Sequence, residues 1–207
     1  MRANERLVAN DGKEVLLFPL EYMNISQDEY GGYSHQNILA IDFLGWGANG
    51  RVLKCPYYAP CSCRCVGTTG ENNRIWQSTA EVHLASGATG YVSWVQAHDD
   101  NPLAIGTVLT QGDLLGHTGT TGNVTGDHVH FNFAIGVYAG WDSSTNNRQL
   151  KNSIHIYDAC FVNDTTIING ENHNWKIWED VPIGFSRENK FPWVLYARKL
   201  RSKSRIK

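Results

Sequence analysis

The chain has 207 residues, of which 42% are hydrophobic and 18% are charged, and it holds seven Trp, nine Tyr and seven Phe. This composition excludes a disordered chain and predicts a packed domain of ordinary size that needs no disulfides. The net charge is −2, but residues 198–207 hold six of the 18 Lys and Arg, which leaves 12 basic and 20 acidic residues elsewhere, a net −8. We therefore expect no nucleic-acid partner. We expect the basic tail to be a solvated chain end, and the alternative is that it binds an anionic polymer or partner.

The first ten residues include Arg2 and Arg6 but no apolar run, so we expect no standard secretory signal. Apolar stretches further along are much shorter than the roughly 18 residues of a transmembrane helix, so we expect no membrane span. Glycine is frequent, at 20 residues, and short alternating stretches separated by turn clusters predict an all-β protein built as a sandwich or as antiparallel sheets.

Residues 38–43 form the first clear strand pattern. Leu39, Ile41 and Phe43 alternate with Ala40 and Asp42, which is the period of a half-buried strand. An unpartnered acid on such a strand is costly, so Asp42 is either a functional ligand or an edge-strand aspartate turned to solvent.

Four of the five cysteines lie close together, and Cys160 stands alone. The every-other-residue spacing of Cys61, Cys63 and Cys65 is that of one strand face, and no paired CxxC accompanies it. We therefore expect free thiols rather than a cysteine zinc site, and the role of the cluster that Cys55 completes stays open.

Residues 91–98 form another strand pattern, and residues 128–135 give the clearest one. There Val129 and every second residue to Ile135 share a core face, while His128, His130 and Asn132 share the other. Two histidines separated by one residue on a strand point to the same side, so both can reach one small volume. That pair alone is also typical of surface or core histidines, but the glycine- and threonine-rich run 116–126 before it suits the rim of a cavity.

The rest of the chain offers fewer signals. Residues 141–152 are polar and predict a long loop, residues 154–168 predict further strand, and residues 175–193 are rich in tryptophan. No linker or repeat divides the chain. We expect one domain over residues 1–197, followed by the basic tail at 198–207.

Five segments, in this order, resemble the lysostaphin/LytM-type zinc metallopeptidases, and together they cover about residues 30–135. They are YSHQNILAIDF at 33–43, YAP at 58–60, QAH at 96–98, GDLLG at 112–116 and TGDHVHF at 125–131. The resemblance implies an antiparallel β-sheet groove of the duplicated hybrid type, with residues 136–197 as an extension. The commonest family pattern has three residues between the first histidine and the aspartate. This chain has six, as in the version seen in phage tail-tip lysins.

The resemblance also implies roles for five side chains. His35, Asp42 and His130 correspond to the ligands of one zinc ion per chain, and His98 and His128 correspond to the catalytic histidines. An offset of seven on a straight strand would send the first two to opposite faces, so His35 must lie in a loop or bend before the strand.

The chemistry suits these roles. Two neutral imidazoles and one carboxylate leave a zinc site with a net charge of +1 that can activate water near neutral pH. The chain has no HExxH helix, so histidines must move the proton. One of His98 and His128 takes a proton from water while the other stabilises the oxyanion or protonates the leaving amine, and the sequence leaves open which does which.

The resemblance therefore implies a zinc endopeptidase that cuts peptide stems or cross-bridges of bacterial peptidoglycan. Two alternative functions remain. One is a catalytically inactive LytM-like module that binds other molecules or has a structural role in the virion, and the other is a carboxypeptidase with the same arrangement of histidines and aspartate. The long ligand gap favours a phage particle component, with tail proteins as candidate partners, over a domain secreted by another route.

Overall fold

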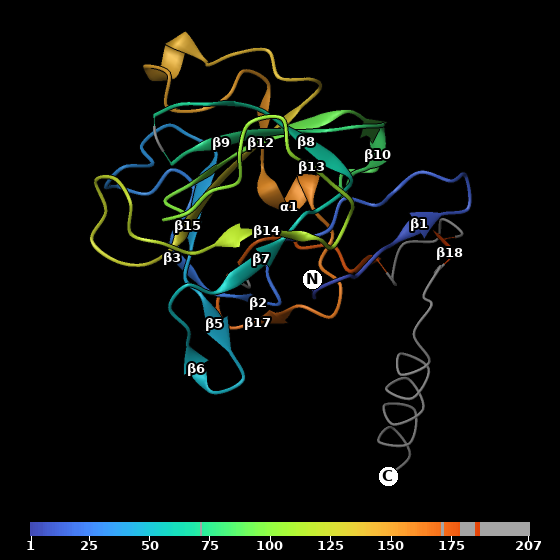
Figure 1. Cartoon of the computed structure of the whole chain (residues 1–207), viewed down its shortest axis with the longest axis horizontal. Coiled ribbons are helices and arrows are strands. Elements are labelled where there is room, and N and C mark those ends of the chain that lie inside the picture. Colours follow the sequence, from blue (N-terminus) through green and yellow to red (C-terminus); the bar gives the residue numbers. More distant parts are fainter. Residues whose placement is uncertain (71, 171, 179–184, 187–207) are drawn as a thin grey trace.

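β-strands dominate the protein. The computed structural model describes residues 1–70, 72–170, 172–178 and 185–186, and eight of its strands form one antiparallel sheet (Figure 1). In spatial order they are β13 (Val108–Leu109), β8 (Cys63–Thr68), β9 (Arg74–Ser78), β12 (Val92–Ala97), β15 (Val129–Ile135), β4 (Ala40–Phe43) and β3 (Ile25–Gln27), with β16 (Ser153–Ile154) also pairing with β15. The predicted all-β, antiparallel class is confirmed.

Short two-stranded pairs surround this sheet. They are β1 (Val8–Ala9) with β18 (Phe185–Ser186), β10 (Val82–His83) with β11 (Thr89–Gly90), β7 (Pro56–Tyr58) with β14 (Leu114–His117), β5 (Trp46–Gly47) with β6 (Gly50–Arg51), and the parallel pair β2 (Tyr22–Met23) with β17 (Thr166–Ile167). The helical elements are a 3-10 turn, η1 (Ser143–Thr145), and α1 (Ile156–Ala159). Neither is long and apolar enough to cross a bilayer, and the described residues hold no other helix that is.

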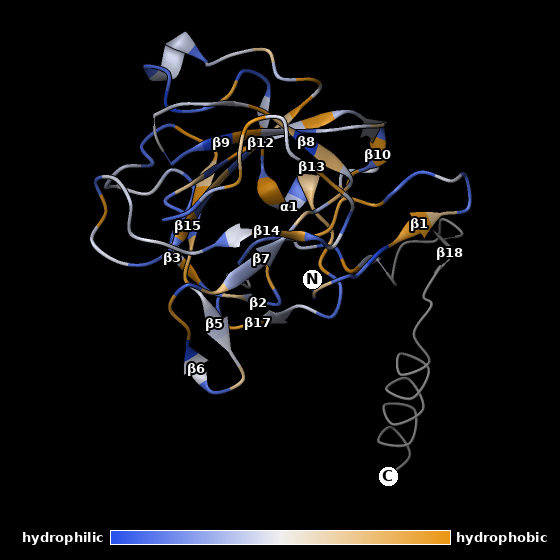
Figure 2. Cartoon of the chain, in the orientation of Figure 1, coloured by the Kyte–Doolittle hydropathy of each residue, from blue (hydrophilic) through white to orange (hydrophobic). Residues whose placement is uncertain are grey.

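The main core lies against one face of the sheet. Val129, Phe131 and Phe133 of β15 point into it and are fully buried, as the alternation predicts, and Ile156 and Ala159 of α1 close it (Figure 2). Ile135 departs from the prediction. It is 43% exposed because it ends the strand, where the core no longer covers it.

Two other predictions need correction. β4 is buried along its whole length, not half-buried, because β15 and β3 flank it and side chains cover both of its faces. Residues 154–168 are not a continuous strand, since α1 occupies Ile156–Ala159. That helix is a single turn, too short to leave a helical period in the sequence, and its Ile and Ala reach the core equally well from a helix.

All five cysteines are free, as expected, and the structure shows that all five are buried. Cys63 and Cys65 lie on the inner face of β8, which explains their alternate spacing. Burial raises the pKa of the Cys61 and Cys63 thiols well above the ordinary value, so these groups are neutral packing residues.

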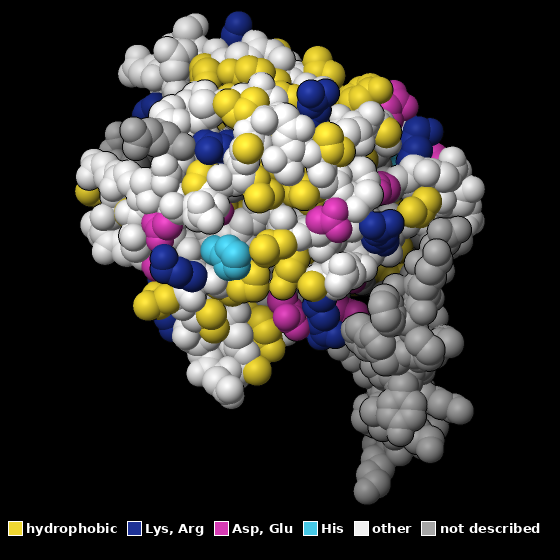
Figure 3. Space-filling view, in the orientation of Figure 1, with side chains coloured by type: hydrophobic (Ala, Val, Ile, Leu, Met, Phe, Trp, Pro, Cys, Tyr) yellow, Lys and Arg dark blue, Asp and Glu magenta, His cyan; other side chains and the backbone are white. Residues whose placement is uncertain are grey.

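Charge on one face of the molecule is mixed. On the face drawn in Figure 3, acidic and basic side chains are interspersed with polar and apolar ones. The predicted basic tail, residues 198–207, lies outside the described residues, and the single-domain assignment of residues 1–197 stays a prediction.

Candidate metal centre

Strand register brings the predicted site residues together. β15 runs between β12 and β4, and His130 stands directly opposite Asp42 on one side and Ala97 on the other. His98 follows Ala97 at the end of β12, so it lies next to the same point of β15. Directly opposite residues in an antiparallel pair have side chains close enough to interact. The sheet therefore places an acid and two histidines around one spot.

His35 joins this spot from the loop between β3 and β4. It has no regular secondary structure, as the seven-residue offset requires, yet it is only 1% exposed. Its Nε2 lies 3.3 Å from Asp42 Oδ1 and 3.3 Å from His130 Nδ1. His130 Nδ1 lies 2.9 Å from the same Asp42 oxygen. One atom from each of the three residues thus faces a common centre.

The spacing of these atoms fits a zinc ion. Tetrahedral zinc with ligand bonds of about 2.0–2.1 Å separates its ligand atoms by roughly 3.3 Å. Two of the three distances match this value, and the third is shortened by the hydrogen bond between His130 and Asp42. Within the described part of the chain, no other group of three or more His, Cys, Asp or Glu side chains converges in this way.

The carboxylate of Asp42 is held in its charged form. Burial raises its pKa, but the contacts of the carboxylate with the His130 and His35 rings outweigh that effect and hold the pKa well below its usual range. Asp42 is only 6% exposed, so it is not the solvent-facing edge aspartate that was one of the two alternatives. A buried carboxylate needs a positive or hydrogen-bonding partner, and a divalent cation would supply one.

A backbone carbonyl orients His35. The Asp28 carbonyl oxygen accepts a hydrogen bond from His35 Nδ1 at 3.0 Å. Because a carbonyl can only accept, Nδ1 carries the proton and Nε2 is left as the free lone pair that faces Asp42 and His130. A ligating histidine ordinarily has an outer partner of this kind.

The two predicted catalytic histidines adjoin the three-residue cluster. His98 and His128 have ring centroids 4.6 Å apart, and His98 lies 6.1 Å from the His130 ring. His98 Nδ1 donates to the Thr121 carbonyl at 2.9 Å, and His128 Nδ1 donates to the Gly126 carbonyl at 2.8 Å. Each ring therefore keeps Nε2 as a proton acceptor. His128 Nε2 lies 3.6 Å from Asp42 Oδ2.

His98 is neutral near pH 7. Burial lowers its pKa to about 4, and the hydrogen bond to Thr121 offsets only part of that effect. A neutral imidazole with an unprotonated Nε2 can accept a proton from water, which is what a general base requires. The position of the ring proton does not decide whether His98 or His128 is the general base, because both rings donate from Nδ1 and leave Nε2 unprotonated.

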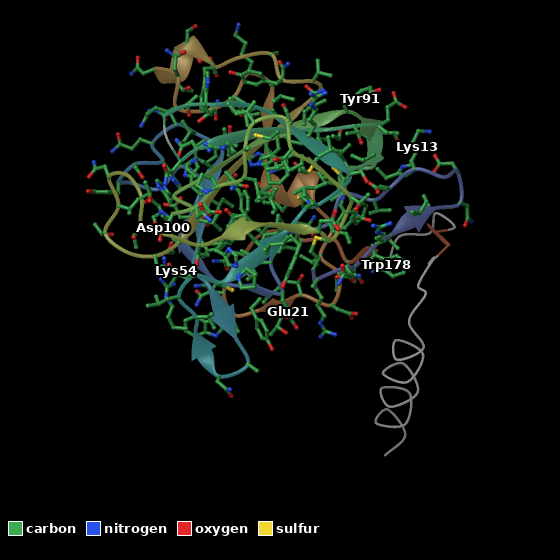
Figure 4. All side chains as sticks on the ribbon, in the orientation of Figure 1. Lys13, Glu21, Lys54, Tyr91, Asp100 and Trp178 are labelled. Carbon is green, nitrogen blue, oxygen red and sulfur yellow. The ribbon has the colours of Figure 1, made fainter. Side chains whose placement is uncertain are left out.

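The segment after β12 holds His98 in an uncommon backbone conformation, with φ at 77°. Asp100, two residues on, accepts hydrogen bonds from Thr120 N at 2.9 Å and Thr121 Oγ1 at 2.8 Å, and it pairs with Lys54 Nζ at 2.9 Å (Figure 4). These contacts fix the loop whose carbonyl binds the His98 ring. A positive φ in a non-glycine residue persists where surrounding contacts determine it.

A groove of about 310 Å³ opens over the cluster. His35, His98 and His130 line it, together with rim residues from several loops, among them Trp141 and Arg148. The rim is polar and aromatic, and the volume lies at the small end of the range for small-molecule sites. A short extended segment of a larger substrate fits such a space better than a folded partner does.

Three polar side chains near the cluster have contacts that the sequence does not indicate. Asn132 shares the β15 face of His128 and His130, and its amide donates to the Leu39 carbonyl and to Ser153 and accepts from Leu150 N, so it joins three segments of the chain. His155 and His173 lie outside the family-matching segments. They bind Glu29 and Asp28, at the start of the loop that carries His35. No spacing signal reveals these pairs, which are 126 and 145 residues apart.

Comparison with known proteins gives relatives in sequence and in structure. No family model matches the chain. It is 40% identical over 174 residues to Morphogenesis protein 1 of Bacillus phage B103. The match covers 82% of this chain and 46% of that protein, so the chain spans less than half the length of this relative.

Two of the solved structures that align with the chain are peptidases. A zinc containing peptidase from Vibrio cholerae aligns with 63% of this chain and 43% of its own, at 15% identity and a TM-score of 0.43. The catalytic domain of the antimicrobial peptidase lysostaphin from Staphylococcus simulans aligns with 59% of this chain and 86% of its own, at 17% identity and a TM-score of 0.42.

Proposed function

We propose that the protein is a zinc-dependent endopeptidase that hydrolyses peptide bonds in the stem or cross-bridge of bacterial peptidoglycan. The observation that carries the proposal is the convergence of His35 Nε2, Asp42 Oδ1 and His130 Nδ1 at spacings that suit one zinc ion. The ordered motif segments supply the substrate class, because the resemblance to lysostaphin/LytM-type enzymes rests on them.

The proposed roles follow from the free atoms of each side chain. His35, Asp42 and His130 would hold the ion, and the ion would supply the Lewis acidity that polarises a peptide carbonyl and activates water near neutral pH. His98 and His128 keep unprotonated Nε2 atoms beside that position and can accept and return a proton. Asp42 Oδ2, 3.6 Å from His128 Nε2, stabilises the His128 ring once it is protonated.

The groove determines which substrates can reach the histidines. Its volume of about 310 Å³ suits a short extended peptide better than a folded protein domain. A substrate strand laid along the groove would pass directly over His98 and His130, with its scissile carbonyl within reach of both.

The test separates metal binding from proton transfer. Asp42→Ala and His130→Ala should lose zinc and activity together, whereas His98→Ala and His128→Ala should retain zinc and lose at least about 100-fold in turnover. Zinc is measured by elemental analysis and activity by digestion of purified peptidoglycan. His83→Ala, which removes a histidine bound to Asp11 in another part of the fold, is the matched control and should leave both values unchanged.

Two results would contradict the proposal. Full activity in metal-free protein excludes zinc catalysis, and full activity in His98→Ala excludes the assigned proton transfer. Mass analysis of the released fragments distinguishes internal cleavage from a carboxypeptidase that removes one terminal residue. Zinc binding without any cleavage would instead identify an inactive binding or structural module.

The biological setting is also a proposal. A relative named Morphogenesis protein 1, from a bacteriophage, supports a role in a phage particle, where a wall-degrading enzyme reaches peptidoglycan on contact with the host. Tail proteins are then the expected partners. Co-purification of the protein with intact particles would test this placement independently of its activity.

A further inference from the structure

We infer that a group of side chains beyond β15 positions His35 for metal binding. We call this group, Arg148, His155, Tyr157 and His173, the His35 strap. It lies outside the family-matching segments and contacts the loop that carries His35, not the His35 ring itself. The inference rests on the proposed function, because it concerns how one proposed zinc ligand is held.

His35 needs such support because the sheet does not provide it. Asp42 and His130 are strand residues whose positions follow from backbone pairing. His35 lies in an irregular segment between β3 and β4, and its ring is oriented from outside the cluster by the 3.0 Å hydrogen bond from Nδ1 to the Asp28 carbonyl. The position of Asp28 therefore sets the direction of the His35 Nε2 lone pair.

The strap fixes Asp28 and its neighbour. His173 Nε2 contacts both carboxylate oxygens of Asp28, at 2.8 and 2.9 Å. His155 Nδ1 contacts both oxygens of Glu29, at 2.8 and 2.9 Å, and the Tyr157 hydroxyl donates to Glu29 Oε1 at 3.0 Å. The Glu29 side chain is only 7% exposed, so these partners compensate a nearly buried carboxylate.

The three strap rings reinforce one another. Tyr157 is stacked between His155 and His173, with centroid separations of 4.8 Å and interplanar angles of 18° on both sides. Stacking makes the two carboxylate contacts parts of one unit, because neither histidine can turn without disturbing the tyrosine. The start of the loop is thus held by a single block.

Arg148 holds the other side of His35. Its guanidinium donates to the Ser34 carbonyl at 3.3 Å and to the Gln36 carbonyl at 2.7 Å, the residues immediately before and after His35. It also donates to the Thr145 carbonyl at 3.1 Å, which ties it to its own loop. The planar fork of arginine suits such a clamp on fixed carbonyl oxygens.

The experiment compares two histidine–aspartate pairs that differ in location. His173 is 14% exposed and Asp28 is 45% exposed, while His83 is 15% exposed and Asp11 is 44% exposed. His173→Ala and His83→Ala therefore each remove a histidine–aspartate pair of matched exposure, and both should lower the melting temperature of the metal-free protein. Only His173→Ala should weaken binding of Zn²⁺, by about 10- to 100-fold in a chelator competition.

Further measurements exclude a merely structural role. With Co²⁺ as a probe, His173→Ala should change the visible absorption spectrum, because one ligand is turned, whereas His83→Ala should reproduce the wild-type spectrum. His173→Gln keeps a donor for Asp28 and should recover part of the Zn²⁺ affinity. Tyr157→Phe removes the hydroxyl but keeps the stack, and should weaken Zn²⁺ binding less than His173→Ala does.

The outcomes separate this inference from the proposed function. If the wild-type protein binds neither Zn²⁺ nor Co²⁺, both proposals are overturned. If the wild-type protein binds Zn²⁺ but His173→Ala has wild-type affinity and an unchanged Co²⁺ spectrum, the strap is overturned while the zinc peptidase proposal stands.

Discussion

At the residue scale, the site is organised by where each imidazole places its proton. His35, His98 and His128 all donate from Nδ1 to a backbone carbonyl, at distances of 2.8 to 3.0 Å. Each therefore presents Nε2 as a lone pair. His130 is the exception, since its Nδ1 faces Asp42 and is the atom available to an ion. The hydrogen bond to Asp42 places a proton on His130 Nδ1, and zinc binding through this atom would require the loss of that proton.

Gly119 has a steric role beside His98. A Cβ at this position would lie 2.1 Å from the His98 carbonyl oxygen and 2.8 Å from Asp100 N. We expect Gly119→Ala to displace the His98 backbone and lower turnover by roughly 10- to 100-fold, with zinc content unchanged. Gly90→Ala, where a Cβ meets no atom within 4 Å, is the control. Turnover is measured by kinetics and zinc content by elemental analysis in both variants. A normal turnover in Gly119→Ala would show that displacement of the His98 backbone does not affect catalysis.

At the element scale, three adjacent antiparallel strands and the loops that follow them determine the site. β12, β15 and β4 bring His98, His130 and Asp42 to one side of the sheet, and the loop 119–121 closes over His98. Asp100 joins the end of β12 to that loop. Hydrogen bonds from Thr120 N, Lys54 and Thr121 lower the pKa of its carboxyl well below the usual range, so it accepts from all three across the physiological range.

Asp100→Asn should weaken this junction. We expect a loss of about 1 kcal/mol in unfolding free energy at pH 7, together with reduced turnover. Because the pKa of Asp100 is depressed in the folded state, its contribution is present above the unfolded carboxyl pKa of about 3.9 and is lost as the pH falls further. The stability difference from wild type should therefore shrink below about pH 4 in denaturant titrations.

A suitable comparison is Asp113→Asn. Asp113 also accepts from the N–H and hydroxyl of a threonine, Thr110, but away from the histidines. Asp113→Asn should lower the free energy of unfolding without lowering turnover. Equal kinetics for the two variants would mean that Asp100 acts on stability alone.

At the scale of the whole molecule, the site joins parts of the chain that are distant in sequence. Its proposed ligands come from a loop, from β4 and from β15, and the strap adds residues up to His173. An ion shared by such segments binds the folded state far better than the unfolded one. Metal binding and global stability are therefore linked.

Zn²⁺ should raise the melting temperature of the wild-type protein. At 100 times its dissociation constant, the ion contributes about 2.7 kcal/mol to the folded state. Asp42→Ala lacks the carboxylate of the cluster and should show no rise at the same concentration. Differential scanning fluorimetry with and without a chelator measures both, and an equal rise in the two proteins would place the bound ion elsewhere.

The sequence alone determined the β class, the shared face of His128 and His130 and the loop position of His35, because alternation and residue offset are local properties of a strand. Which strands adjoin is not local. Only the tertiary structure decided that β15 lies between β12 and β4, which buries Asp42 and brings His98 beside it. It also turned Asn132 to structural contacts and made Ile156–Ala159 a helix. The bonds from His155 and His173 to the His35 loop likewise join residues more than 100 positions apart, and no local pattern encodes such a pairing.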